Sequence, residues 1–279
     1  MVDPPSLGAG ALVKATDGAV ETSKHLLVRL LGPPADVYGD FFAERASARV
    51  ERRRKRLAER ALAKAQDKSG AVNARVAVRI IQDASITDNE VFLEYLSGVL
   101  ASSRTPDGQD DSGISWSSLL STMSSVQIRA HFLLYREWAE LLHEHGIDLT
   151  RDWARGNVSL WVEYGEFERA LNIVRGSSLL QHALTGLARN GLIEDHDWGP
   201  RTEAHLVNSP YDEVVVAVPS IAGFELYGWA QGRADMPLER FPFEAEVFDT
   251  EPSTPRLKTA LLFESVMEIF RENERKQDS

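Results

Sequence analysis

Cysteine is absent from the sequence. Disulfide scaffolds, cysteine nucleophiles, iron–sulfur clusters and zinc sites built on thiolates are therefore excluded. Long apolar runs are also missing, because no stretch approaches the roughly 18 uncharged apolar residues that a membrane-spanning helix needs. The first residues show no basic segment ahead of an apolar core, so no secretory signal is expected. We therefore predict a location in the reducing cytoplasm.

The common catalytic motifs are missing as well. There is no phosphate-binding glycine loop, no His-Glu-x-x-His or Gly-x-Ser-x-Gly segment, and no kinase or dinucleotide-binding signature. Seven histidines are present. His143 and His145 stand two apart on an expected helix, so their side chains point in different directions and do not share a metal. We predict no cofactor, no metal and no small-molecule substrate, and the sequence favours a protein that is not an enzyme.

The composition is that of an ordinary globular protein. The 279 residues are 43% hydrophobic and 26% charged, which excludes a collagen-like or wholly disordered chain. The length suggests about two domains, each able to bury a core.

Charge is distributed unevenly along the chain. The formal net charge is -11, yet residues 45–79 hold 12 Lys and Arg against 3 Asp and Glu. The densest basic stretch consists of Arg52, Arg53, Arg54, Lys55 and Arg56. Three interpretations remain open: this helix docks against the acidic remainder of the same protein or a sister subunit, or it binds nucleic acid, or it binds an anionic lipid surface. No aromatic residues alternate with the lysines and arginines of this stretch, so stacking on single-stranded nucleic acid has no support.

The predicted fold class is mainly α, with an N-terminal helical region that contains a long basic helix. A winged-helix-like α+β part and a C-terminal helix follow. We divide the chain into a disordered start (1–8), an N-terminal helical arm (9–68), a helical domain (69–146), a winged-helix-like domain (147–235) and a C-terminal extension with a helix (236–279).

The basic helix is expected over residues 35–67, after a stop at Gly32-Pro33-Pro34. Its apolar positions form a narrow seam, which is typical of a helix that pairs with another helix. Because such a seam is only half covered in a monomer, we expect self-association.

Two helix starts have capping signatures. Thr87-Asp88-Asn89-Glu90 reads as a capping box. Ser124 and Gln127 open a helix that runs to about Glu144, and Gly146 occupies the position of a left-handed C-cap.

After residue 146 the sequence pattern changes, and the order of the expected elements is that of a winged helix. The expected elements are a strand over 158–162, helices over 167–174 and 178–189, a strand from Leu192 to Glu194, a loop, and a returning strand over 214–218. A helix after Pro219-Ser220 and a last helix from Thr254-Pro255 to about Glu274 complete the chain.

The second helix of this module is the candidate recognition helix. Ser178, Gln181, His182 and Arg189 are polar residues that it would present to a partner. One arginine without any lysine is a poor match to the phosphates of a DNA duplex. The sequence therefore favours protein binding over DNA binding for this helix, with another protein as the expected partner.

Two polar groups are weaker hints of chemistry. Arg136 and His143 lie seven residues apart on one face of an expected helix, as in helical ribonucleases with an arginine–histidine motif. They are the candidate catalytic residues if the protein cleaves RNA. Asp195-His196-Asp197 is expected in the wing loop, where an exposed polar turn is favoured over a metal site.

Membrane contact is a further alternative. Residues 8–31 are amphipathic and rich in small side chains. Their charged residues argue against insertion into a bilayer, though not against binding to its surface.

Three segments resemble the abortive-infection alpha (Abi-alpha) family of bacterial proteins. The first is Leu31 to Ala65, the second is Ile81 to Leu100 followed by Ala101-Ser102-Ser103, and the third is Leu184 to Glu194 followed by the segment 218–224. Their order matches that of the family over roughly residues 30–230. The resemblance implies a role in bacterial resistance to phage infection, and none of the matching motifs is catalytic.

The predicted function is thus an antiphage protein that acts by macromolecular association. The alternatives are a nucleic-acid-binding winged-helix regulator, a helical RNase toxin that uses the Arg136 and His143 pair, and a toxin that acts at a membrane surface.

Overall fold

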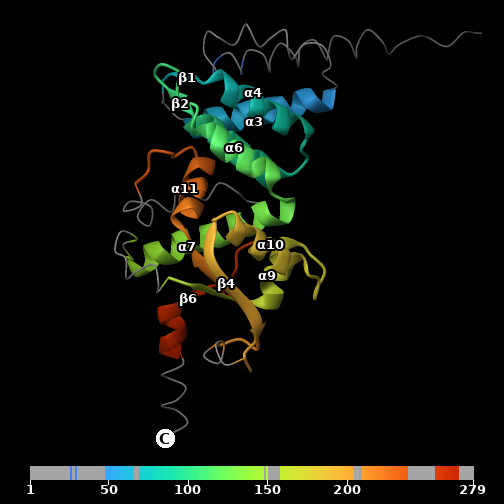
Figure 1. Cartoon of the computed structure of the whole chain (residues 1–279), viewed down its shortest axis with the longest axis vertical. Helices are drawn as coiled ribbons and strands as arrows, with labels where there is room; N and C mark the ends of the chain where they lie inside the picture. The colour runs from blue at the N-terminus through green and yellow to red at the C-terminus, as the bar shows by residue number, and fades with distance from the viewer. Residues whose placement is uncertain are drawn as a thin grey trace, which may run out of the picture. The chain divides into compact units, whose positions relative to one another are not determined.

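The computed structural model describes residues 26, 29, 48–65, 69–147, 149, 158–203, 206, 209–237 and 255–269. The predicted start (1–8), the proline stop and most of the amphipathic segment 8–31 lie outside these residues. The chain divides into two compact units (Figure 1). Unit 1 comprises residues 1–121 and 229–234, and unit 2 comprises residues 122–228 and 235–279.

Unit 1 is a helical assembly. Its elements are α3 (Ala48–Ala65), β1 (Ala71–Val72), α4 (Ala74–Ile86), α5 (Glu90–Ser102), β2 (Arg104–Thr105) and α6 (Gly113–Thr122), whose last residue belongs to unit 2. β1 and β2 pair antiparallel, with Ala71 opposite Thr105. The helix α3 packs on both α4 and α5.

The central helix of unit 1 is α5. All of its residues are buried except Glu90 and Phe92, as expected for a helix that is surrounded by protein. Gly98 is required in it, because a Cβ at this position would lie 1.7 Å from the carbonyl oxygen of Ala230. The segment 229–234 therefore packs directly on the backbone of α5.

The seam of the basic helix is covered inside unit 1. Leu57, Ala58, Ala61 and Ala65 are 0% exposed. Within the described residues, the partner of this seam is supplied by the same chain. Self-association stays a prediction.

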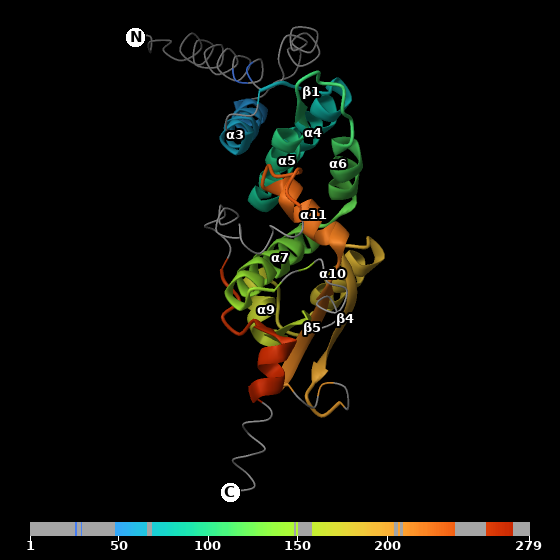
Figure 2. The same ribbon diagram turned by 90° about the vertical axis from the view of Figure 1, so that its left-hand side faces the viewer.

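Unit 2 has a winged-helix-like topology (Figure 2). Its elements are α7 (Ser125–His145), β3 (Leu160–Glu163), α9 (Tyr164–Leu171), α10 (Leu179–Arg189), β4 (Ile193–Pro200), β5 (Glu213–Pro219), α11 (Ile221–Ala230), whose last two residues belong to unit 1, and β6 (Leu261–Leu262). The sheet has the order β4-β5-β3-β6, with each neighbouring pair antiparallel. Residues 263–269 form a helix.

The core of unit 2 is organised by Tyr135 on α7. Its hydroxyl donates to the carbonyl of Leu192 and accepts from the backbone N–H of Ser220 at 3.1 Å. Its ring meets Phe224 edge-on, with 4.9 Å between ring centroids. One side chain thereby joins α7 to the start of β4 and to the start of α11. Burial raises the pKa of this phenol, which stays protonated.

The mainly α fold with a winged-helix-like part is confirmed, and so are several local predictions. Ser124 and Gln127 form the capping box of α7, and Gly146 adopts a left-handed conformation with φ of 61°. The helix α10 and the strand β5 occur where they were predicted, whereas α9 lies three residues earlier than predicted and β4 extends to Pro200.

Three local predictions are wrong, and the first is the capping box that was expected to start at Thr87. The N-cap of α5 is Asn89, whose side chain accepts from Val91 and Phe92. Thr87 instead accepts from the N–H of Asn89 at 3.1 Å. The segment Asp195-His196-Asp197 lies in β4 and not in the wing loop, because its residues pair with β5 after a register shift between Ile193 and Asp195.

The last helix does not begin at Thr254-Pro255. Carboxylates take the backbone N–H groups there: Glu137 accepts from Leu257 at 3.1 Å, and Glu166 accepts from Lys258 at 2.9 Å and from Thr259 at 2.8 Å. Residues 261–262 then pair with β3, so the helix starts only at residue 263.

The predicted domain boundaries also differ from the compact units. The predicted helical domain (69–146) contains α7, which belongs to unit 2. The aromatic contacts and hydrogen bonds of Tyr135 explain this assignment, because they tie α7 to the winged-helix elements.

Candidate functional site

The basic stretch on α3 lies against acidic residues of its own unit. Arg53 forms an ion pair with Asp88 and donates to the carbonyl of Ser85 at 2.8 Å. Arg56 pairs with Glu90, Arg54 with Glu51 at 3.1 Å, and Lys55 with Glu59 at 3.8 Å. Of the five predicted anion-binding residues, Arg52 is exposed, and no acidic residue in the described part of the chain forms an ion pair with it.

Further along α3, Lys64 forms a buried ion pair. Lys64 lies 2.6 Å from Glu94, and both side chains are 7% exposed. Lys64 also donates to the carbonyl of Ala230 at 2.6 Å, and Arg60 reaches Glu90 at 2.7 Å. The contacts therefore favour the first of the three interpretations, in which the basic helix docks against acidic residues of the same protein.

The candidate catalytic pair is not assembled as a site. The guanidinium of Arg136 is 3% exposed, pairs with Glu137 at 2.9 Å and donates to the carbonyl of Pro255 at 2.6 Å. It also lies over the ring of Phe132, 5.2 Å from its centroid. His143 is exposed near the end of α7. A guanidinium held inside the protein is not positioned to bind a phosphate beside an exposed imidazole.

The candidate recognition helix does present a polar face. Ser178, the N-cap of α10, and His182, Thr185 and Arg189 on the helix are all exposed and recur every three or four residues. We call these four residues the α10 face. Leu180, Ala183, Leu184 and Leu187 occupy the buried side. Gln181 was also predicted as a recognition residue, and it is half-buried at the edge of the face.

Residues of β4 extend the α10 face sideways. The Nε2 atom of His196 lies 3.3 Å from the hydroxyl of Thr185, and the imidazole stacks on Trp198 with 5.4 Å between ring centroids. Burial lowers the pKa of His196, so the ring is neutral at pH 7. The surface therefore runs from α10 across His196 to Trp198.

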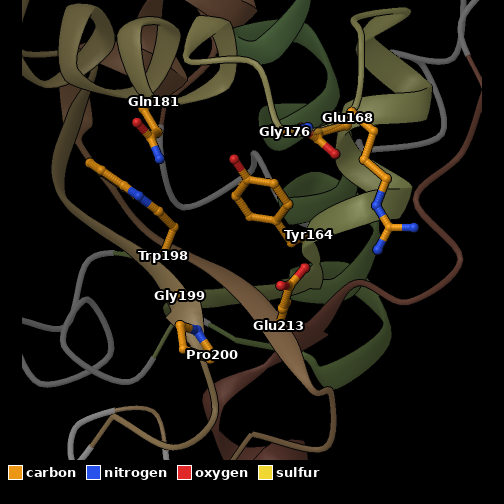
Figure 3. Close-up of a pocket in the computed structure, with 9 residues that line it drawn as sticks. Tyr164, Glu168, Gly176, Gln181, Trp198, Gly199, Pro200 and Glu213 are labelled. Atoms are coloured by element: carbon orange, nitrogen blue, oxygen red, sulfur yellow. The ribbon is translucent and has the colours of Figure 1, made fainter.

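A pocket opens beside Trp198 (Figure 3). It has a volume of about 330 Å³. Its lining residues come from α9, from the turn before α10, from α10 itself, from the end of β4 and from the start of β5: Tyr164, Glu168, Arg175, Gly176, Gln181, Trp198, Gly199, Pro200 and Glu213.

Tyr164 lies in the middle of this pocket. Figure 3 shows its hydroxyl turned toward Gln181 and Trp198, with the carboxylate of Glu213 below its ring. Burial, followed by the negative charges of Glu168 and Glu213, raises the pKa of the phenol. Both carboxylates therefore act on the pocket electrostatically.

Glu168 is the buried acid of the pocket. It is 1% exposed, and its Oε1 atom accepts from the N–H of Gly176 at 2.7 Å. Its Oε2 atom is also buried, and no described residue donates a hydrogen bond to it. A buried acceptor without a partner costs about 1–3 kcal/mol, and more when it carries charge.

A second cavity adjoins the first and is also acidic. It has a volume of about 550 Å³ and shares Arg175 and Glu213 with the first pocket. Glu163, Pro210, Tyr211 and Asp212 complete its lining.

Over the described residues, unit 2 holds 16 Asp and Glu against 8 Lys and Arg. This charge repels polyanions and attracts cations.

Neither metal binding nor membrane insertion gains support from the described residues. Within them, no group of three or more potential metal ligands comes together. In the same part of the chain, no helix has both the length and the apolar character required to cross a bilayer.

Sequence reasoning found part of this surface and missed the rest. It singled out Ser178, Gln181, His182 and Arg189, because they are polar positions on one predicted helix. It missed Tyr164, Glu168, Trp198 and Glu213, which come from separate elements and meet only in the fold. The available signal was the segment Tyr164-Gly165-Glu166-Phe167-Glu168, in which aromatic and acidic residues lie close together directly after a predicted strand.

Comparison with family models, curated proteins and solved structures gave no match. The kinship with Abi-alpha proteins therefore stays a prediction that rests on the three sequence segments.

Proposed function

We propose that this protein acts in the bacterial cytoplasm as a non-enzymatic antiphage protein that binds another protein through the α10 face of unit 2. The phage-resistance role comes from the resemblance to the Abi-alpha family. The mode of action comes from the surface chemistry. No bond is made or broken by the polypeptide in this proposal.

The acidic balance of unit 2 is the observation that carries the choice of partner. A winged helix that binds a duplex must place basic side chains against phosphates. The α10 face has a single arginine, and the unit around it has twice as many acidic as basic residues among those described. Protein surfaces do not impose that electrostatic requirement, so a protein partner fits better.

The basic helix supports the same choice. Arg53, Arg56 and Lys64 are engaged with Asp88, Glu90 and Glu94. Binding of nucleic acid or lipid by these bases would have to compete with ion pairs that already hold unit 1 together.

A plaque assay with variants of the α10 face tests the proposal. The triple variant His182→Glu, Thr185→Glu and Arg189→Glu reverses the charge of the face without touching its buried side. We expect wild type to reduce plaque counts at least tenfold in a bacterial host, and the triple variant to lose this protection while its circular dichroism spectrum and melting temperature stay unchanged.

The matched control is Glu225→Lys, an exposed position on α11, which should protect like wild type. Failure of wild type to protect against any phage of a broad panel contradicts the antiphage role. Full protection by the triple variant contradicts the use of the α10 face.

A further inference from the structure

We propose that the pocket beside Trp198 binds a basic side chain, lysine or arginine, of the partner protein. This inference rests on the proposed function, because the pocket borders the α10 face. It adds the chemistry that the partner must present.

Continuity with the α10 face is the first step. Thr185 of the face contacts His196, His196 stacks on Trp198, and Trp198 lines the pocket. Gln181, on the edge of the same helix, lines it as well. A protein that covers the face would therefore cover the mouth of the pocket.

The buried carboxylate is the second step. Glu168 is 1% exposed, and its Oε2 atom receives no hydrogen bond from the described residues. The other oxygen is fixed by Gly176 at 2.7 Å. An ammonium or guanidinium group in the pocket would carry the charge opposite to that of this buried carboxylate.

The aromatic walls are the third step. Tyr164 and Trp198 line the same pocket as the two carboxylates (Figure 3). Cations bind favourably over aromatic faces, and the aliphatic stem of lysine or arginine packs well on them. A combination of acids with aromatic walls selects an organic cation over a bare metal ion, which would require several oxygen ligands.

Among the described residues of the lining, Arg175 alone carries a positive charge, and it is exposed. It opposes a bound cation, but Glu168 and Glu213 accompany it in the first cavity, and Glu163 and Asp212 join it in the second. The local balance therefore remains negative. These four carboxylates would repel an anionic ligand, so the pocket does not suit one.

Nuclear magnetic resonance of the full chain, labelled with ¹⁵N at the tryptophan indoles, provides the test. The Trp198 signal is identified by its loss in Trp198→Phe. The probes are the capped tripeptides acetyl-Gly-Arg-Gly-amide, acetyl-Gly-Lys-Gly-amide and the neutral acetyl-Gly-Gln-Gly-amide. We expect both basic peptides to shift the Trp198 signal saturably, and the glutamine peptide to bind at least tenfold more weakly.

The variants separate the pocket from general acidity. Glu213→Gln, at an exposed position, and Glu168→Gln should each weaken binding of the arginine peptide at least threefold, whereas Arg175→Gln should strengthen it. Glu225→Gln, an exposed acid outside the pocket, should leave it unchanged. If Glu168→Gln fails to fold, Glu213→Gln and Arg175→Gln still decide the outcome.

Three results would overturn the inference. They are equal shifts from the glutamine peptide, unchanged affinity in both Glu213→Gln and Arg175→Gln, and binding of free spermidine more than tenfold tighter than the arginine peptide. The last result would assign the pocket to free polyamines. A pocket that fails this test while the α10 triple variant still loses phage protection leaves the proposed function intact.

Discussion

At the scale of single residues, unit 2 depends on a few buried polar side chains. Tyr135 is fully buried and exchanges hydrogen bonds with Leu192 and Ser220. His131 stacks on it with 4.4 Å between ring centroids. Sequence periodicity placed both residues on the expected helix, but it could not assign these hydrogen bonds. The partners lie about 57 and 85 residues away along the chain.

Removal of the Tyr135 hydroxyl should destabilise unit 2. In Tyr135→Phe the buried N–H of Ser220 loses its acceptor, and the expected loss in free energy of unfolding is about 1–3 kcal/mol. Urea unfolding followed by circular dichroism measures it. Tyr164→Phe removes a hydroxyl at a half-buried position and serves as the control, with a loss below about 1 kcal/mol expected. Equal stability of Tyr135→Phe and wild type would show that the network contributes nothing.

His131 should make the protein sensitive to mild acid. Burial lowers the pKa of its imidazole from 6.5 to about 3. Below about pH 6.5 the imidazole is therefore protonated in the unfolded chain but not in the folded chain. The free energy of unfolding falls as the pH drops from there toward 3. This one group contributes a slope of up to about 1.4 kcal/mol per pH unit.

The variant His131→Gln isolates that contribution. Glutamine does not titrate, so its urea-unfolding free energy should depend less steeply on pH between about 6.5 and 3 than that of wild type. Parallel pH profiles for the two proteins would exclude His131 as the source.

At the scale of secondary-structure elements, capping residues and periodicity predicted most helices, and long-range pairing decided the exceptions. The capping box of Ser124 acts locally, so it is readable from sequence. The late start of the last helix is not, because Glu137 and Glu166 on distant helices claim its backbone N–H groups. The same holds for Asp195 to Asp197, whose strand conformation depends on pairing with β5.

The docking of α3 on α5 is the element-scale feature with the clearest energetic test. Glu94 is 7% exposed and lies 2.6 Å from Lys64 and 3.4 Å from Arg60. Glu94→Gln leaves two bases without their shared carboxylate and should lower the free energy of unfolding by about 3 kcal/mol, as for other broken buried pairs.

Glu59→Gln is the matched control on α3. Glu59 is exposed and lies 3.8 Å from Lys55, and such a pair contributes about 0–1 kcal/mol. Urea unfolding compares the two variants. A loss no greater for Glu94→Gln than for Glu59→Gln would mean that the buried ion pairs do not hold α3 in place.

At the scale of the whole molecule, charge is the feature that connects sequence to function. The sequence showed a basic segment in an acidic chain, which left three partners open. Within unit 1 the bases meet Asp88, Glu90 and Glu94. In unit 2 the acids are in excess around a polar helix face. The candidate pocket could not be predicted because its residues converge from five separate segments, and their meeting depends on the strand register.

The most direct measurement is site-specific photo-crosslinking in phage-infected bacteria, with a photoreactive amino acid at Thr185 on the α10 face and, as the control, at Glu225. Because we propose that the α10 face binds another protein, we expect a discrete adduct of higher mass from position 185 that is destroyed by protease, resists nuclease and is absent from position 225. A nuclease-sensitive adduct from position 185, or the same adducts from both positions, would contradict it.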